Sequence, residues 1–200
     1  MGAICHDLDH RGYNNKFMID IKSPLAQVIQ NITYMSDDDH DHDDAQIYTT
    51  STMENHHFHM GVSILQQETN SIFDCLNPEE YKEVLDVMKK AILATDLALF
   101  FPNKARLANI VKENSFDWAV SDHRMLAMAL CMTGSDLNSS SKPWAVQRKT
   151  SDVVYAEFHE QGDVEKSLGW KPIPLFDRDN YPELASMQVR SSDTSSMKGR

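Results

Sequence analysis

Apolar residues recur three and four positions apart over much of the 200-residue chain, while the alternation typical of strands is almost absent. This spacing places apolar side chains on one face of a helix, so the sequence predicts an all-α, multi-helix protein. The segment that begins at Asn77 illustrates the pattern. Asn77 can cap a helix, Pro78 suits its first position, and Glu80 completes a capping box. The predicted apolar face consists of Val84, Leu85, Met88, Ile92 and Leu93.

Three further helices are predicted from the same spacing. Residues 51–67, STMENHHFHMGVSILQQ, place four residues along one helix face: Met53, His57, Met60 and Ile64. A helix that starts at Ser121 is apolar nearly all round from Met125 to Met132, and such helices are usually buried on several sides. Residues 151–169 form an amphipathic helix that is expected to break at Gly162.

The composition is that of a soluble protein, with 41% hydrophobic and 24% charged residues. No apolar run approaches the roughly 18 residues that a membrane span needs. Charged residues appear within the first ten positions, so no secretory signal is expected. The three cysteines, Cys5, Cys75 and Cys131, form no CxxC pair and no disulfide framework. This pattern favours a reducing, cytoplasmic location.

The acidic character of the chain is concentrated in one segment. The formal net charge is −11, and residues 28–46 contain six Asp and no Lys or Arg, which leaves −5 for the remainder. This balance argues against a nucleic-acid partner, which requires a basic face. Like-charge repulsion predicts that residues 28–46 are a disordered insertion. The Ser-rich tail, residues 190–200, is also predicted to be disordered.

Two stretches are rich in residues that bind metals. SDDDHDHDDAQ, residues 36–46, is the denser, but ordering a mobile segment around an ion costs conformational entropy. We therefore favour a solvated insertion over an ion-binding or partner-binding loop. In CHDLDHRG, His6 and His10 share a helix face and Asp7 follows His6 directly. Imidazole and carboxylate together suit Zn²⁺ or a Zn/Mg pair, with a salt-bridged surface as the alternative.

Other acids and histidines stand at the ends of predicted helices: Glu54, His56, His57, Asp96 and Asp136. Asp96 is expected to end an apolar helix, where an unpaired carboxylate would be costly. Taken singly, each residue is more often a cap or a satisfied core histidine. Taken together, they are typical of a metal site built inside a helical bundle.

Seven short stretches appear in a fixed order: ICHDLDHRGYNN, SPLAQ, YTTSTMENHHF, ILATDLALFF, SKPW, VYAEFHEQGD and SMQV. Together they resemble the catalytic domain of the class I 3',5'-cyclic nucleotide phosphodiesterases. Several stretches are most similar to the type-ten branch, followed by types eleven and five, the dual-specificity branches with regulatory GAF domains. The similarity covers residues 3–27 and 47–189, so residues 1–189 are interpreted as a partial catalytic domain.

The resemblance implies an all-α fold and a site with two divalent ions, Zn²⁺ and Mg²⁺, with Mn²⁺ as an alternative. It implies that the metal ligands are His6, Asp7 and Asp136, with Asp7 as the bridge between the ions. The residues implied to surround the ions and the phosphate are His10, Asn15, Glu54, His57 and Asp96. The residues implied to contact the purine are Gln188, Val154 and Tyr155. The implied reaction is hydrolysis of cAMP, cGMP or both to the 5' monophosphates.

The chain also departs from the family. Family members have a histidine-rich segment upstream of HDLDH, which supplies the general acid and a metal ligand, and Ser191 stands where a purine-clamping phenylalanine is expected. The chain is therefore expected to be truncated at both ends and inactive alone. Removal of residues 28–46 gives a join, SPLAQ-IYTTSTMENHH, that resembles the family without a gap. Because valine codons begin with GT and one glutamine codon ends with AG, we hypothesise a retained intron, with a real insertion as the alternative. Sequencing the transcript distinguishes the two.

Three functions remain open at this point. The first is cyclic nucleotide hydrolysis by the parent protein, with a homodimer formed through regulatory domains. The second is a non-catalytic truncated product that acts only by association. The third, a different metal phosphohydrolase of the HD type, is disfavoured by the ordered MENHHF, SKPW and SMQV motifs.

Overall fold

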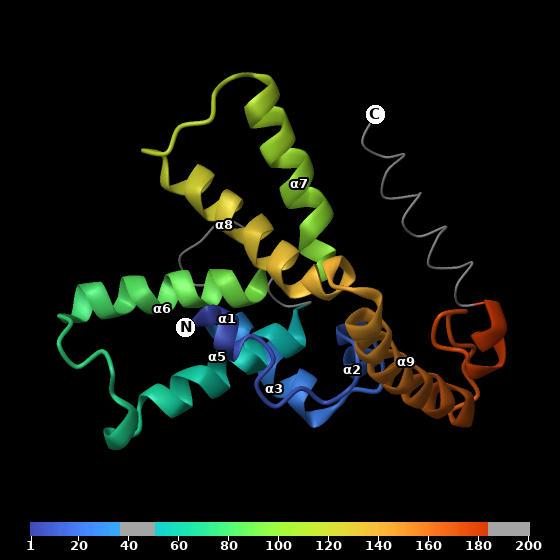
Figure 1. Cartoon of the computed structure of the whole chain (residues 1–200). Coiled ribbons are helices and arrows are strands. Elements are labelled where there is room, and N and C mark those ends of the chain that lie inside the picture. The colour runs from blue at the N-terminus through green and yellow to red at the C-terminus, as the bar shows by residue number, and fades with distance from the viewer. Residues whose placement is uncertain (37–50, 184–200) are drawn as a thin grey trace. The chain divides into compact units, whose positions relative to one another are not determined.

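The computed structural model describes residues 1–36 and 51–183, and every regular element within these ranges is a helix, as the sequence predicts. The α-helices are α1 (Gly2–Cys5), α2 (Asn15–Asp20), α3 (Pro24–Ser36), α5 (Thr52–Leu65), α6 (Pro78–Leu93), α7 (Leu97–Lys112), α8 (Ser121–Asp136) and α9 (Trp144–Ser167). The 3-10 helices are η1 (Glu68–Asn70), η2 (Leu137–Ser141) and η3 (Arg178–Glu183). The chain divides into two compact units, Met1–Asn138 and Ser139–Arg200 (Figure 1).

Helix α6 begins as predicted, and it ends in a way that the sequence pattern did not reveal. The Asn77 side chain accepts from the Glu80 amide at 2.9 Å, and the Glu80 carboxylate accepts from the Asn77 amide at 3.0 Å. The helix stops at Leu93, and Asp96 caps the next helix by accepting from the Ala98 amide at 2.9 Å. The prediction that Asp96 ends an apolar helix is therefore wrong. Aspartate is a preferred N-cap because its carboxylate satisfies an orphan amide.

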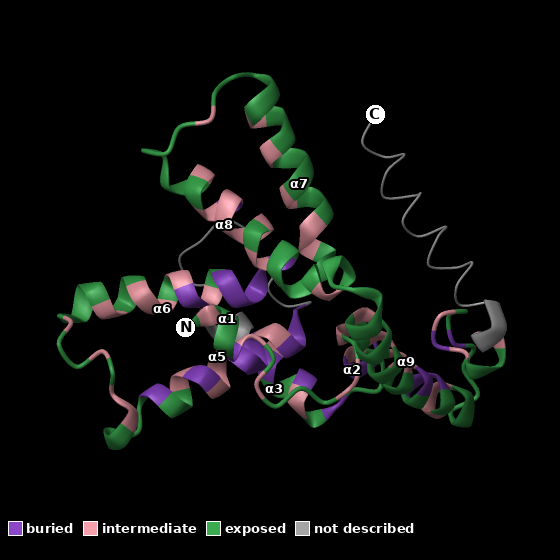
Figure 2. Cartoon of the chain, viewed as in Figure 1, coloured by how far each residue is buried: buried purple, intermediate pink, exposed green. Residues whose placement is uncertain are grey.

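The core of the first unit is built around α1, which packs against both α5 and α6 (Figure 1). Gly2 allows this approach, since a Cβ at that position would lie 3.0 Å from the Ala91 Cβ. One buried cluster consists of Cys5, Leu65, Met88 and Ile92. A second cluster consists of Met18, Ala26 and Met53. The buried segments of α5 and α6 mark this core in Figure 2.

The buried face of α5 differs from the predicted one. Besides Thr52, Asn55 and His56 near its N-terminus, the helix has buried residues at a spacing of four: Met53, His57, Gly61 and Leu65. Ile64, predicted to share the face with Met60, is 38% exposed. A spacing of four keeps the face under α1 and α6, and His57 becomes one of the most deeply buried side chains of the unit.

Helix α8 begins at Ser121 as expected, but burial on several sides is wrong for the residues that the structure describes. Only Leu126 and Thr133 of this helix are buried, because α6 and α7 are the described helices that cover it. The Thr133 hydroxyl donates to the Ala94 carbonyl at 2.6 Å. This bond fixes the last turn of α8, which carries Asp136, against the end of α6.

Helix α3 extends into the segment that was predicted to be a disordered insertion. It continues through Ser36, and Ile29 is buried within it. Residues 28–36 are therefore helical, because Leu25 and Ile29 continue an apolar spacing of four toward α5. Residues 37–46 of the predicted insertion lie outside the described residues, as does the tail at 190–200.

In the second unit, α9 runs without a break through Gly162 and ends at Ser167. Gly169, with φ +77°, follows the helix end, where a left-handed glycine is common. The predicted break at Gly162 is wrong. This glycine instead lets the backbone of Phe176 come close, since a Cβ at Gly162 would lie 1.9 Å from the Phe176 carbonyl oxygen. The Phe176 ring stacks on Phe158 at 4.6 Å between centroids.

The three cysteines are free. Within residues 1–36 and 51–183, no helix has both the length and the apolar character that crossing a membrane requires.

Two helical glycines give a matched test of this packing. Gly162→Ala is expected to destabilise the second unit by about 1 to 3 kcal/mol, because the methyl group overlaps the Phe176 backbone. Gly134→Ala in α8 meets nothing within 4 Å and is expected to stabilise the chain by about 0.5 to 1 kcal/mol through helix propensity. Urea denaturation of both variants measures the difference, and equal effects would contradict the described contact.

Candidate metal centre

The predicted metal ligands and the residues expected around them lie in the first unit. They are carried by the loop between α1 and α2, by helices α2, α5 and α8, and by the N-cap of α7. The loop begins at His6, which follows α1, and its chain direction is set by two left-handed residues, Asp9 with φ +58° and Gly12 with φ +71°. His57 of α5 lies against it: its Nδ1 donates to the Leu8 carbonyl oxygen at 2.6 Å. The loop therefore takes its position from the buried helix α5.

His6 faces two carboxylates. Its Nδ1 donates to the Ala3 carbonyl oxygen at 2.9 Å, so Nε2 is the atom that faces Asp136 Oδ1 at 3.0 Å and Asp7 Oδ2 at 3.6 Å. A lone pair on Nε2 would be repelled by these oxygens unless a proton or a metal ion lies between them. Burial lowers the pKa of His6, but the Ala3 hydrogen bond and the charges of Asp7 and Asp136 outweigh it, so the pKa lies above its ordinary value.

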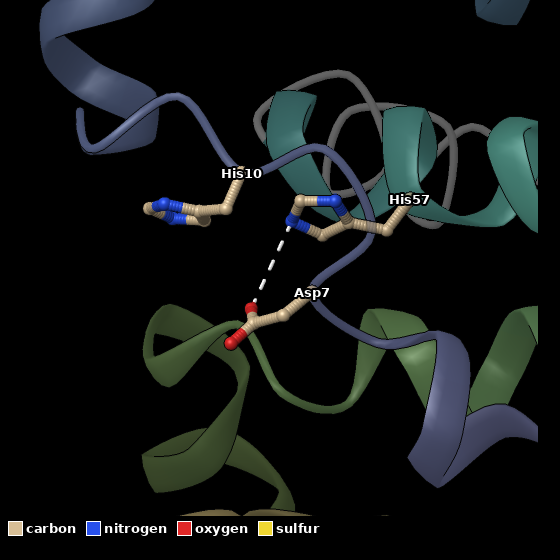
Figure 3. A group of neighbouring side chains, drawn as sticks. All are labelled: Asp7, His10 and His57. Atoms are coloured by element: carbon tan, nitrogen blue, oxygen red, sulfur yellow. Dashed lines mark ion pairs between the residues drawn. The ribbon is translucent and has the colours of Figure 1, made fainter.

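His57 faces the same aspartate (Figure 3). Its Nε2 lies 4.0 Å from Asp7 Oδ1, while its Nδ1 is engaged by the Leu8 carbonyl. Burial lowers the pKa of His57 and outweighs the Leu8 hydrogen bond and the charge of Asp7. His57 is therefore a neutral imidazole near neutral pH, with the lone pair of Nε2 directed toward Asp7.

His10 has the opposite tautomer. Its Nδ1 accepts from the Gly12 amide at 3.0 Å, so the proton is on Nε2. The ring stacks on His57 with centroids 5.6 Å apart and an interplanar angle of 25°. Each of Asp7, His10 and His57 offers one ligand-type atom, and these atoms lie within 4.8 Å of one another. In this tautomer His10 can donate a hydrogen bond from Nε2, whereas His57 offers a lone pair.

A buried polar network lies at the N-terminal ends of α2, α5 and α7. The Asn15 side-chain amide donates to Glu54 Oε2 at 2.8 Å and to Asp96 Oδ2 at 3.5 Å. Asn15 Oδ1 accepts from the Met53 amide at 2.7 Å, and the Ser51 hydroxyl donates to Asp96 at 2.6 Å. Burial, with the charge of Asp96, raises the pKa of Glu54 to about 7. Glu54 can therefore gain or lose a proton near neutral pH.

The donor set fits divalent ions. Imidazole nitrogen with carboxylate oxygen suits Zn²⁺, and carboxylates suit Mg²⁺ or Mn²⁺. Asp7 faces two histidines, because its Oδ2 lies near His6 and its Oδ1 lies near His57. A cavity of about 300 Å³ adjoins this centre. It is lined by Ala3, His6, Thr95, Met132, Ser135 and Asp136.

The structure brings together most of the residues that the sequence singled out. His6 and Asp136, 130 positions apart, are in hydrogen-bonding contact. Three residues form one group, Asp7, His10 and His57, and three form another, Asn15, Glu54 and Asp96. Val154 and Tyr155 lie on α9 in the second unit, where the Tyr155 ring stacks on His159 at 6.4 Å. Gln188 lies outside the described residues.

The sequence assigned no role to Asp9, and it placed His56 among the candidate site residues without indicating a partner for it. His56 Nε2 donates to Asp9 Oδ2 at 2.9 Å, and Arg11 donates to the same oxygen at 2.6 Å. The available signal was the second aspartate of HDLDH beside the paired histidines of ENHHF. Residues 47 positions apart cannot be paired from one sequence.

A centre of histidines and aspartates held by helices is typical of a class of proteins that includes metal phosphohydrolases. A comparison with known families identifies the family within this class. The model of the 3'5'-cyclic nucleotide phosphodiesterase family matches residues 1–195. The chain belongs to this family.

Individual relatives agree. The chain is 45% identical over 189 residues to the "Probable 3',5'-cyclic phosphodiesterase pde-5" of Caenorhabditis elegans, covering 94% of this chain and 23% of that protein. It is 40% identical over 190 residues to the "cGMP-specific 3',5'-cyclic phosphodiesterase" of Drosophila melanogaster, covering 94% and 15%. A solved structure, "LmjPDEB1 in complex with IBMX", superposes with a TM-score of 0.77 at 29% identity, covering 94% of this chain and 51% of that chain.

The chain thus spans about a quarter or less of the length of these curated relatives and about half of the solved structure. The all-α phosphodiesterase fold and the family membership that the sequence motifs predict are confirmed. The assignment to the type-ten branch stays a prediction.

The raised pKa of Glu54 makes stability depend on pH. Between pH 4.5, the ordinary value, and about 7, folded Glu54 holds a proton that the unfolded chain has lost, so the free energy of unfolding falls as pH rises through this window. The fall is about 3 kcal/mol in the metal-free chain. Glu54→Gln cannot ionise, so its free energy of unfolding should lack this pH-dependent fall.

Urea denaturation at pH 5 and pH 8 measures the effect. We expect Glu54→Gln to be more stable relative to the wild type at pH 8 than at pH 5. If the free energies of unfolding of the two proteins differ by the same amount at both pH values, the raised pKa of Glu54 is contradicted.

Proposed function

We propose that the protein to which this chain belongs hydrolyses 3',5'-cyclic nucleotides, cAMP, cGMP or both, to 5' monophosphates with bound divalent metal ions. One observation carries the proposal. Two histidines, His6 and His57, use Nδ1 on backbone carbonyls and direct Nε2 toward Asp7, a geometry in which a carbonyl orients a metal-binding imidazole.

The metal ligands that we propose are His6, Asp7 and Asp136. The mixed nitrogen and oxygen donors of His6 and Asp136 favour Zn²⁺, and the exposed carboxylate of Asp7 favours a second, harder ion such as Mg²⁺ or Mn²⁺. Bound ions of this kind lower the pKa of water and neutralise the charge of phosphoryl oxygens. The two oxygens of Asp7, which face different histidines, support its role as the shared ligand.

The surrounding residues have separate proposed roles. His10 donates from Nε2 to a phosphoryl oxygen or to water, since its Nδ1 is held by Gly12. Glu54 is proposed to exchange a proton with water near the ions, and Asn15 donates to the carboxylates of both Glu54 and Asp96. Hydrolysis adds the oxygen of water to phosphorus and breaks its bond to the 3' oxygen, which takes up a proton.

The purine is proposed to contact Gln188, Val154 and Tyr155. Val154 is 40% exposed on α9, so its side chain is accessible to a ligand within its own unit. A glutamine amide can pair with adenine or guanine by turning over, so both nucleotides are retained as substrates. Dimerisation through regulatory domains and a cytoplasmic location stay predictions.

Metal binding tests the proposed ligands. Asp136→Ala is expected to weaken Zn²⁺ binding by at least tenfold, because it removes a charged ligand opposite His6. His6→Ala should have an effect at least as large. Isothermal titration of the chain with Zn²⁺ measures the affinity. Asp86→Ala, which breaks only an exposed ion pair with Lys90 on α6, is the matched control. Zn²⁺ affinity equal to that of the control in both variants would contradict the site.

Hydrolysis distinguishes the proposed enzyme from a non-catalytic product. The assay uses the protein to which this chain belongs. If it hydrolyses labelled cAMP or cGMP only with a divalent ion, and His6→Ala abolishes this activity, the proposed enzyme is supported. Turnover that survives His6→Ala would show that the ligand assignment is wrong. The same assay with the 200-residue chain alone shows whether this part is sufficient for turnover.

A further inference from the structure

We propose that Asp9 and His56 form a latch that positions the metal-binding loop, residues 6–12, and so sets the affinity of the metal centre. The inference rests on the proposed function, since it concerns the same centre. Asp9 belongs to the loop and His56 to α5, and His56 Nε2 donates to Asp9 Oδ2 at 2.9 Å. The latch is thus a bond between the loop and a core helix.

The backbone conformation of Asp9 favours such a restraint. Its φ of +58° is left-handed, a conformation that is unfavourable for residues with a Cβ and is tolerated best by Gly, Asn and Asp. A strained residue of this kind persists only where surrounding contacts hold it. The His56 hydrogen bond supplies one contact, and it acts on the strained residue itself.

Two consecutive helix residues hold two consecutive loop residues. His57 Nδ1 donates to the Leu8 carbonyl at 2.6 Å, and His56 Nε2 donates to the Asp9 side chain. The restrained pair lies between Asp7 and His10, whose backbones are joined by a hydrogen bond from the His10 amide to the Asp7 carbonyl at 3.2 Å. Release of Asp9 would therefore move Asp7 and His10 away from His57.

The contribution of Arg11 to the latch is small by comparison. Arg11 also donates to Asp9 Oδ2, at 2.6 Å, but its side chain is 51% exposed and solvent screens such pairs. The His56 side chain is 11% exposed and belongs to a core helix, so its N–H is held in place more firmly than that of Arg11. His56 is therefore the partner that fixes Asp9.

Asp9 is proposed as a positioning residue, because its Oδ2 is engaged by His56 and Arg11 and it does not belong to the group of ligand-type atoms on Asp7, His10 and His57. Partners that orient metal ligands typically change metal affinity by about 10- to 100-fold when they are lost. Loss of the latch is expected to fall in this range.

A graded series at position 9 tests the proposal by Zn²⁺ titration of the full chain, with Co²⁺ absorption as a report on coordination geometry. Asp9→Gly keeps the left-handed backbone without strain but removes the acceptor, and it should weaken Zn²⁺ binding by about 10- to 100-fold. Asp9→Asn keeps both the conformation and an acceptor, and should stay within about fivefold of the wild type because a neutral hydrogen bond is weaker. Thermal unfolding without metal confirms that each variant is folded.

The series is repeated from the helix side. His56→Gln retains an N–H near the position of Nε2 and should preserve affinity, whereas His56→Leu should behave like Asp9→Gly. The double variant of Asp9→Gly and His56→Leu should bind Zn²⁺ no more weakly than either single variant, because one bond is lost in all three. Additive losses would overturn the latch.

The outcomes separate this inference from the proposed function. If Asp136→Ala weakens Zn²⁺ binding but Asp9→Gly, folded, binds as the wild type does, the latch is wrong and the metal site stands. If Asp136→Ala leaves binding unchanged, the metal site itself is wrong. An Asp9→Asn variant as weak as Asp9→Gly would also overturn the latch, since the acceptor is retained there.

Discussion

The hydrogen bond from His57 Nδ1 to the Leu8 carbonyl, at 2.6 Å, is the interaction on which the centre depends. It joins a side chain that is 2% exposed to the loop of residues 6–12, so the core helix α5 restrains the backbone around Leu8. The same bond fixes the tautomer of His57 and leaves Nε2 facing Asp7. This contact therefore fixes the tautomer of the imidazole and, together with the Asp9–His56 bond, restrains the loop.

Packing of the helices explains why this contact forms. Gly2 brings α1 close to α6, and the buried residues of α5 follow a spacing of four that turns His57 toward the loop. Thr133 fixes the last turn of α8 to the end of α6, which places Asp136 opposite His6. Charge then accumulates in a partly buried site, and the raised pKa of Glu54 is one consequence.

The sequence predicted much of the fold, including the capping box of α6 and the all-α class, because capping chemistry and helical spacing are local. The predicted helix break at Gly162 was wrong. A glycine is needed there because the backbone of Phe176 lies against the helix, and a local sequence pattern does not reveal this contact. The sequence motifs identified the candidate residues, but they did not show which of these residues contact one another. The latch between Asp9 and His56 depends on a left-handed backbone angle that no residue pattern reveals.

Backbone carbonyls select the imidazole tautomers on which the proposed metal site depends. Nitrogen-15 NMR of the histidine-labelled chain, recorded with and without Zn²⁺, measures these tautomers directly. We expect protonated Nδ1 in His6 and His57 and protonated Nε2 in neutral His10, with a Zn²⁺-induced shift at His6 Nε2. Protons on Nε2 of His57, or a His6 signal indifferent to Zn²⁺, would contradict it.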